Sequence, residues 1–218
     1  MRYYLTALAG LGLASAAIPA SAMIVIFDSP GAVQPDENVL FKGAPPSGNK
    51  AFGVTNKSNT GVTFTGNEAL VTPSKGQARV AAADGGLSQL ALMLTNPTLG
   101  FKEVEFNIFG TKATATSVTL NFLDQFGTTF GDTFTINNGR NFFSARALDD
   151  QFITNVSFLL DGDVANVRQF RIGGIGEFGG DGSGAVVPEP ESWMMLIAGF
   201  GLVGSMARRR KALLSVSA

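Results

Sequence analysis

Hydrophobic and polar residues alternate through much of the middle of the chain. Between Lys102 and Phe109, the side chains of Val104, Phe106 and Ile108 fall on one face of an extended segment, and polar side chains fall on the other. A period of two is typical of a β-strand that buries one face. The same alternation groups further hydrophobic residues: Val118 with Leu120 and Phe122, Phe134 with Ile136, Val156 with Phe158 and Leu160, and Phe170 with Ile172. The middle of the chain therefore predicts several half-buried strands.

Clusters of Asp, Asn and Gly separate these strands and indicate turns. They lie at 124–127, 137–139, 149–150 and 161–163. Shorter strands are expected at 23–27, 39–41, 61–65, 78–82 and 87–94, and the rest of 28–50 is expected to be irregular. Strands at intervals of roughly 8–12 residues, with turns between them, favour a sandwich or barrel over a parallel α/β fold. We expect an all-β fold, an antiparallel β-sandwich, and we expect helices only at the two chain ends.

The N-terminus has the pattern of an export signal. Arg2 supplies a positive start, residues 5–17 form an apolar stretch of Leu, Ala and Gly, and Pro19 precedes the small residues Ala20 and Ala22. Small residues at these two positions fit the rule for signal peptidase. We therefore expect export through the Sec system and cleavage after Ala22. The exported chain has no cysteine, so its fold depends on its own core and not on disulfides.

The C-terminus carries a second signal of a different kind. Pro188, Glu189 and Pro190 are expected to form an extended strip, because proline fixes φ and disfavours helix in the residue before it. A helix over 192–207 would be about 24 Å long, somewhat shorter than the ~30 Å hydrocarbon core, and Trp193 is placed to anchor it at the interface. Four basic residues follow: Arg208, Arg209, Arg210 and Lys211. By the positive-inside rule they stay in the cytoplasm, which places the body outside.

Glycines in the apolar run have the spacing G-x-G-x-x-G, at Gly199, Gly201 and Gly204. A dinucleotide site of this pattern needs a preceding strand and an acidic residue about 20 positions further on, and only 14 residues follow Gly204. We interpret the spacing as a packing feature instead. Gly201 and Ser205 form a small-x-x-x-small face on which another membrane helix can dock, for example one of a processing enzyme. The alternative is that the membrane helix simply tolerates glycine.

This tail resembles the C-terminal sorting signal of the PEP-CTERM proteins, which combines a Pro-Glu-Pro motif, a short glycine-containing membrane helix and an arginine-rich end. The resemblance implies that an exosortase, an integral-membrane processing enzyme, recognises the tail. It also implies delivery of the body to the cell surface or extracellular matrix, often in exopolysaccharide-producing bacteria. Bodies joined to this tail are often jelly-rolls. The segment is also catalogued as an ice-binding-protein C-terminal domain, a label that gives no evidence of ice binding.

Composition divides the chain into segments of different character. Seven of the thirteen residues at 173–185 are glycine, which is typical of a flexible linker. We expect a signal peptide at 1–22, a β-sandwich body at 23–172, a glycine-rich linker at 173–186 and a sorting signal at 187–211. The chain has a net charge of −1, but residues 23–186 hold eleven basic and fifteen acidic residues, a net charge of −4. Such a body gives no reason to expect nucleic acid as a partner.

The chain contains no His and no Cys, which excludes the usual His bases, Ser-His-Asp and Cys-His nucleophiles and thiolate metal sites. A glycosidase needs two carboxylates across a cleft, and Glu103 and Glu105 are the candidate pair. Two residues apart on one strand, they point the same way, so we expect a solvated strand face. We therefore expect a non-catalytic protein without a cofactor.

Several binding activities remain open for the body. Carbohydrate of an exopolysaccharide matrix is one, although residues 23–186 hold no Trp or Tyr and seventeen Phe, most of which we expect in the core. Asp161 and Asp163 are weak calcium candidates, the alternative being that each caps backbone in a turn. An ice-binding adhesion protein would need a regular threonine array, and Thr114, Thr116 and Thr119 do not keep one period.

A hydrophobic contact surface is a further possibility. Phe126, Phe130, Phe142 and Phe143 lie at strand ends or in a pair of which one must face outward. Exposed apolar patches mark contacts with partners. We expect these four residues to form a surface for self-association or for contact with other matrix proteins.

Overall fold

The computed structural model describes residues 23–110 and 113–178. All the regular elements in these ranges are strands: β1 (Ile24–Phe27), β2 (Glu37–Phe41), β3 (Lys50–Thr55), β4 (Gly61–Gly66), β5 (Leu70–Val71), β6 (Gly76–Gln77), β7 (Arg79–Ala82), β8 (Leu87–Leu94), β9 (Leu99–Gly100), β10 (Glu103–Gly110), β11 (Ser117–Asp124), β12 (Thr129–Thr135), β13 (Gly139–Ala147), β14 (Ile153–Val164), β15 (Asn166–Gly173) and β16 (Gly176–Glu177). In this part of the chain, no helix has the length and apolar character needed to cross a membrane. The two terminal helices predicted from the sequence lie outside the described residues.

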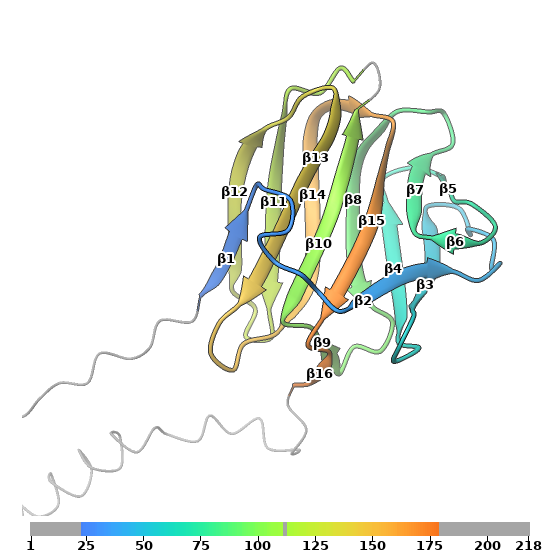
Figure 1. Ribbon diagram of the computed structural model, residues 1–218. Coiled ribbons are helices and arrows are strands. Elements are labelled where there is room, and N and C mark those ends of the chain that lie inside the picture. Colours follow the sequence, from blue (N-terminus) through green and yellow to red (C-terminus); the bar gives the residue numbers. More distant parts are fainter. Residues whose placement is uncertain (1–22, 111–112, 179–218) are drawn as a thin grey trace, which may run out of the picture. The chain divides into compact units, whose positions relative to one another are not determined.

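The all-β antiparallel prediction is confirmed, and the main sheet curls into a nearly closed barrel (Figure 1). Its strands follow the order β1-β13-β10-β15-β2-β3-β4-β8-β14-β11-β12. Strand β2 joins the two halves of this sheet, because it pairs with β15 on one side and with β3 on the other. The end strands β1 and β12 lie around a depression of about 500 Å³ and, in the described chain, do not pair with each other. The barrel is therefore open along one seam.

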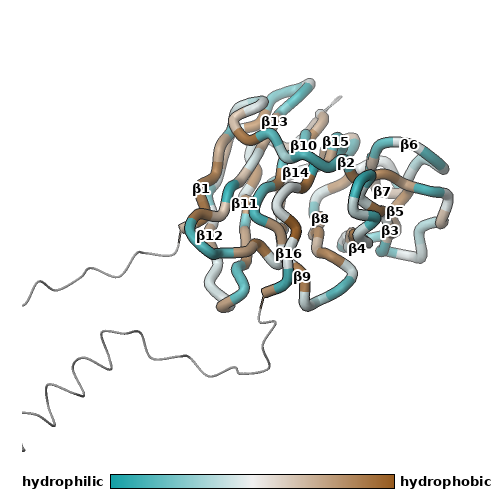
Figure 2. Tube along the Cα trace, turned by 60° about the horizontal axis from the view of Figure 1, so that its bottom comes forward, coloured by the Kyte–Doolittle hydropathy of each residue, from teal (hydrophilic) through white to brown (hydrophobic). Residues whose placement is uncertain are grey.

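A phenylalanine-rich core fills the space between the two halves. The ring of Phe106 on β10 lies 5.9 Å from that of Phe158 on β14, 6.0 Å from Phe170 and 6.2 Å from Phe143. Eight phenylalanines are buried: Phe41, Phe64, Phe101, Phe106, Phe122, Phe143, Phe158 and Phe170. Hydrophobic and hydrophilic residues alternate along the strands, so one face of each strand supplies this core (Figure 2). The strand alternation read from the sequence is the alternation that builds the core.

Two long strands differ from the expectation. Strands β3 and β13 were not predicted, because their buried side chains include small or polar ones such as Ala51, Thr55, Ser144 and Ala145, which give no hydrophobic pattern. The predicted turn at 161–163 is also wrong: these residues belong to the end of β14, at a shift in its pairing with β8. The turns at 124–127 and 149–150 are present.

The ordered body continues into the glycine-rich segment. Strand β15 runs to Gly173, and β16 pairs with β9 through Gly176 and Gly100. The backbone N–H of Phe178 donates to the carbonyl of Thr98 at 3.2 Å. The described body therefore ends on a strand pair tied to the β8–β10 connection.

Candidate functional site

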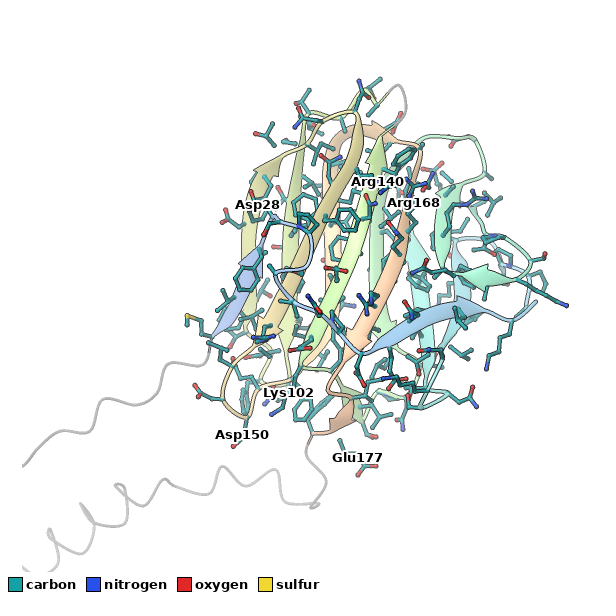
Figure 3. The ribbon with its side chains drawn as sticks, viewed as in Figure 1. Asp28, Lys102, Arg140, Asp150, Arg168 and Glu177 are labelled. Atoms are coloured by element: carbon teal, nitrogen blue, oxygen red, sulfur yellow. The ribbon has the colours of Figure 1, made fainter. Side chains whose placement is uncertain are left out.

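Arginine is confined to one half of the sheet. All five arginines of residues 23–178 lie on β7, β13 and β15: Arg79, Arg140, Arg146, Arg168 and Arg171. The strands of the other half, β3, β4, β8, β11, β12 and β14, carry a single basic residue, Lys50. Arg140 and Arg168 lie near each other over β10 and β15 (Figure 3). Positive charge thus gathers on one outer face of a body with a net negative charge.

Two of these arginines pair with carboxylates of β10. Arg146 Nε lies 2.9 Å from Glu103 Oε1, and Arg171 Nη1 lies 3.8 Å from Glu105 Oε1. The expectation that Glu103 and Glu105 form a solvated face is wrong for Glu105, whose side chain is buried. The β1–β2 loop crosses this end of the sheet, and the backbone N–H of Gly31 donates to Glu105 Oε2 at 3.0 Å.

The other three arginines, Arg79, Arg140 and Arg168, are named here the arginine cluster. In the described residues none of them has a carboxylate oxygen within 4.0 Å. Arg79 lies directly opposite Arg168 in the β7–β15 register. The guanidinium carbon of Arg168 lies 3.6 Å from the centre of the Phe109 ring, and Arg140 is the cross-strand partner of Phe109 on β13. Arg168 and Arg140 therefore flank one aromatic side chain, and Arg79 lies beyond Arg168 on the next strand.

This arrangement works against the stability of the fold. Burial, together with the charges of Arg140 and Arg79, lowers the pKa of Arg168 from its ordinary value. An arginine keeps its charge even so, because its pKa starts far above neutrality. Like charges directly opposite each other on neighbouring strands are destabilising. Among the described residues, the contact of Arg168 with the Phe109 ring offsets part of this repulsion, and no carboxylate oxygen lies within 4.0 Å of the cluster.

A β-bulge orients two consecutive side chains of β15 toward this face. The register between β10 and β15 shifts between Glu105 and Asn107, and Gln169 has a φ of +58°. Val167 and Phe170 are both buried, so Arg168 and Gln169 between them both face outward. A left-handed non-glycine residue costs energy, and strained residues of this kind cluster at active and ligand-binding sites.

Amide hydrogen bonds hold the bulge in place. Asn107 Nδ2 donates to Gln169 Oε1 at 2.8 Å, and the backbone N–H of Asn141 donates to Asn107 Oδ1 at 3.2 Å. Asn107 is fully buried beneath the face. Gln169 Nε2 has no acceptor among the described residues, so it remains available as a donor next to Arg168.

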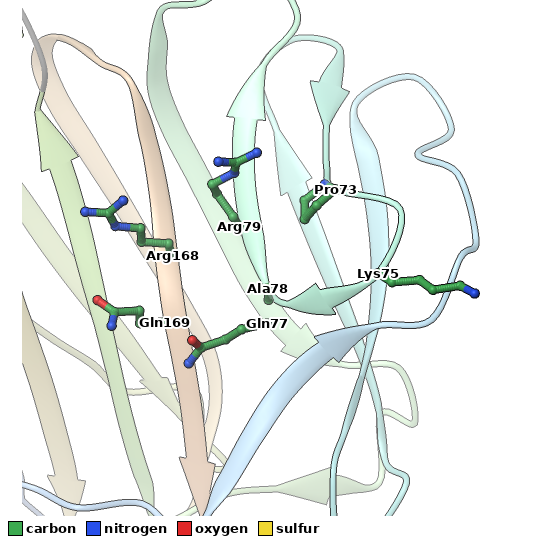
Figure 4. Close-up of a pocket in the computed structure, with 7 residues that line it drawn as sticks. All are labelled: Pro73, Lys75, Gln77, Ala78, Arg79, Arg168 and Gln169. Carbon is green, nitrogen blue, oxygen red and sulfur yellow. The ribbon is translucent and has the colours of Figure 1, made fainter.

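Two shallow depressions lie beside the arginine cluster, one at β7 and β15 and one at β13. One, of about 320 Å³, is lined by Gln77, Arg79, Arg168 and Gln169 from β6, β7 and β15 (Figure 4). The other, of about 410 Å³, lies between the β1–β2 loop and β13 and includes Arg140. The first offers guanidinium and amide donors over an open surface, and the second carries Asp28 as well as Arg140.

Asp161, one of the two aspartates considered for calcium, holds the backbone at the start of β11. Asp161 accepts hydrogen bonds from Thr116 Oγ1 at 2.6 Å and from the backbone N–H groups of Thr116 and Ser117 at 2.8 and 2.9 Å. These bonds hold the pKa of Asp161 far below its usual range. Asp163 lies near Glu68 and Asp84, where burial and then Asp84 raise the pKa of Glu68. Within the described ranges, no three acidic residues are placed to hold a metal ion.

The predicted phenylalanine surface does not form. Phe143 is buried in the core, and Phe130 packs against it. Phe126 is 74% exposed at the β11–β12 turn, and Phe142 is half-buried on β13. Because Phe143 and Phe130 point into the core, the four residues do not form one exposed hydrophobic patch.

The arginine cluster was not predicted from the sequence, although the sequence contains two signals of it. Buried residues on a regular strand are two positions apart, but Val167 and Phe170 are three positions apart. The extra residue between them indicates the bulge. The other signal is the absence of arginine from every stretch except those around 79, 140–146 and 168–171 in residues 23–178.

Several predicted site residues lie outside the described residues. They are the cleavage positions Ala20 and Ala22, the motif Pro188, Glu189 and Pro190, the membrane-anchor residues Trp193, Gly199, Gly201, Gly204 and Ser205, and the basic residues Arg208, Arg209, Arg210 and Lys211.

Comparison with known families bears on this tail. Residues 186–211 match the model of the PEP-CTERM protein-sorting motif. The chain carries a PEP-CTERM sorting signal. Proteins with this signal are exported and sorted at the membrane by exosortases, so the motif implies processing of this chain by an exosortase.

Other comparisons are distant. No curated protein matches the chain. Among solved structures, an exo-β-agarase is 16% identical over 65% of this chain, with a TM-score of 0.33. The match spans 25% of the agarase chain, and at this level of similarity it assigns no activity.

Proposed function

We propose that this chain is an exported, non-catalytic protein of the cell surface or extracellular matrix, with a jelly-roll-like β-sandwich body. The observation that carries the proposal is the PEP-CTERM match at 186–211, which follows a β body and a glycine-rich segment in the same chain. In this proposal signal peptidase removes residues 1–22 after Sec export, and the 192–207 helix holds the chain in the membrane until an exosortase acts.

The tail residues have distinct roles in this mechanism. The strip of Pro188, Glu189 and Pro190 is the recognition element, because two prolines keep it extended and open to an enzyme. Trp193 anchors the outer end of the helix, and the basic residues after it fix the orientation. Gly201 and Ser205 allow close approach of an exosortase helix. The enzyme then separates the body from the membrane segment.

A non-catalytic body agrees with the use of its buried carboxylates. Glu105 is held by Gly31 and Arg171, and Glu37 accepts hydrogen bonds from Ser58. Asp124 accepts bonds from Gln151 and from turn backbone. Each of these groups is engaged in holding strands or turns together.

Carbohydrate binding is the second candidate function, as a module of the exopolysaccharide matrix. The observation that favours it is the open outer face of β13, β10 and β15, with the arginine cluster, Gln77 and Gln169 beside the Phe109 ring. Planar amides and guanidinium groups are suited to hydroxyl and carboxylate groups of sugars.

The sorting proposal is tested by Glu189→Ala in cells that contain an exosortase. The processed wild-type chain is expected to lose the mass of its tail and to leave the membrane fraction, and E189A to remain full-length in the membrane. Asp181→Ala removes a carboxylate outside the matched residues and is expected to be processed like the wild type. Removal of 187–218 is expected to release a soluble body. Processing of E189A at the wild-type rate, or membrane retention of the truncated chain, would contradict the proposal.

A further inference from the structure

We propose that the arginine cluster, with Gln169, binds a polysaccharide that carries carboxylate groups, laid across β13, β10 and β15. The inference rests on the carbohydrate-binding candidate above and adds to it the face, the residues and the chemical class of the sugar. The sorting signal plays no part in it.

Two arginines of this face already pair with carboxylates, which indicates the chemical group that the arginine cluster can bind. Where β10 supplies a carboxylate, at Glu103 and Glu105, the neighbouring arginines lie 2.9 and 3.8 Å from it. At the other end of β10 the residues on the outer side are the buried Asn107 and the half-buried Phe109, and no carboxylate oxygen of the described chain lies within 4.0 Å of the arginine cluster. A guanidinium group matches a carboxylate with two parallel N–H donors. A ligand carboxylate would give the arginine cluster the kind of partner that Glu103 and Glu105 give to the other two arginines.

The structure favours a sugar polymer over an acidic peptide. Extended peptides bind sheets by adding a strand to a free edge. Here β10 is paired with β13 and β15, β13 also pairs with β1, and β15 also pairs with β7, so the backbone of the face is already hydrogen-bonded. Recognition must come from side chains alone. The depressions at β7 and β15 and at β13 suit a chain that repeats carboxylate and hydroxyl groups along its length.

The binding groups are fixed in advance. Arg168 lies over the Phe109 ring at 3.6 Å, and Gln169 is held by Asn107 at 2.8 Å with its Nε2 group free among the described residues. Side chains that are already ordered lose little conformational entropy on binding. The left-handed backbone at Gln169 is the cost of placing both residues on one face.

The test uses the full-length chain in a neutral detergent, with polygalacturonate as the probe and isothermal titration calorimetry as the measurement. Binding to the wild type is expected, and it should weaken as salt is added. The double variant Arg79→Gln/Arg140→Gln changes two exposed side chains and is expected to raise the Kd by roughly tenfold or more, because charge-assisted hydrogen bonds are lost. Arg168→Lys keeps the charge but loses the planar fork, and is expected to weaken binding as well.

The matched control is Lys42→Gln/Lys50→Gln, which makes the same change in net charge away from the arginine cluster. Its Kd is expected to stay within about twofold of the wild type. Thermal unfolding of each variant checks that the fold is kept. The proposal is overturned if the wild type does not bind polygalacturonate, or if the two double variants weaken binding equally. It is also overturned if carboxyl-reduced polymer or poly-L-glutamate binds as tightly as polygalacturonate.

Failure of this inference is distinguishable from failure of the sorting proposal. The arginine variants are expected to be processed by the exosortase at the wild-type rate, because they leave residues 186–211 unchanged. Normal processing without polygalacturonate binding removes only the inference. Polygalacturonate binding with unimpaired processing of E189A removes only the sorting proposal.

Discussion

At the scale of single residues, Glu37 joins two segments that are distant in sequence. Its Oε2 accepts hydrogen bonds from the backbone N–H and the hydroxyl of Ser58 at 2.8 and 2.9 Å, and from the backbone N–H of Lys57 at 3.3 Å. Burial alone would raise the pKa of Glu37, but these hydrogen bonds outweigh burial and the pKa is lowered. The carboxylate thereby holds the start of β2 against the β3–β4 turn.

We expect Glu37→Gln to lower the free energy of unfolding by about 1–2 kcal/mol at pH 6, because an amide replaces a charged acceptor of several hydrogen bonds. A lowered folded-state pKa stabilises the fold above the ordinary glutamate pKa of about 4.3, and this stability is lost as the pH falls through the folded-state pKa. The difference between E37Q and the wild type should therefore shrink toward pH 3. Urea denaturation at both pH values measures it.

The neighbouring Asp36 supplies the control. Its carboxylate pairs with Lys57 at 3.1 Å, but the side chain is 62% exposed. Exposed ion pairs contribute little, so Asp36→Asn is expected to change stability by less than about 0.5 kcal/mol at either pH. If both substitutions lowered the free energy of unfolding equally, the contribution of Glu37 would come from its negative charge alone and not from its hydrogen bonds.

At the scale of elements, β10 organises the body. It lies between β13 and β15 in the sheet, and its outer side chains form the middle of the arginine-bearing face. Its inner residue Phe106 contacts rings from three other strands, including Phe158 of the opposite half. The same strand therefore supports the core on one side and the candidate site on the other.

Phe106→Ala is expected to destabilise the protein by about 3–5 kcal/mol, because it leaves a cavity at the meeting point of the two halves. Phe126→Ala removes a ring that is 74% exposed, and a change within about 0.5 kcal/mol is expected. Chemical denaturation of both variants compares them. Similar losses of stability would contradict the placement of Phe106 at the centre of the core.

The elements also show what sequence can and cannot predict here. Strands β10, β11 and β14 were predicted because large hydrophobic residues alternate along them, and the sorting motif was recognised because its parts are contiguous. Strand β13 was not predicted, because the polar residue Ser144 occupies a buried position on its outer side and gives no hydrophobic signal there. The arginine cluster depends on pairing between strands far apart in sequence, and register of that kind is set by tertiary packing.

At the scale of the whole molecule, the predicted cleavage position after Ala22 lies two residues before the first residue of strand β1. Strand β1 starts at Ile24 and pairs with β13 from Ile24 to Phe27. Cleavage after Ala22 would leave all of these pairs intact and a single residue before the strand.

Mass spectrometry of the exported protein is expected to find Met23 at the N-terminus. Ala22→Asp is expected to block this cleavage, because signal peptidase requires a small residue there. Ser21→Asp changes the unrestricted position between the two alanines, and its cleavage should be nearly unaffected. An N-terminus that lies inside 24–27 in the wild-type protein would contradict the assignment.

The bridging role of β2 has a consequence for the timing of folding during secretion. Glu37 pairs with Ile172, and Ile24 pairs with Ala147. The first strands of the chain therefore pair with segments that lie more than a hundred residues further along the sequence. Such non-local pairing slows folding. Under the proposed Sec export, a chain that leaves the translocation channel N-terminus first cannot complete its barrel until almost the whole body has emerged. The order of the strands therefore delays completion of the barrel until late in the proposed transport.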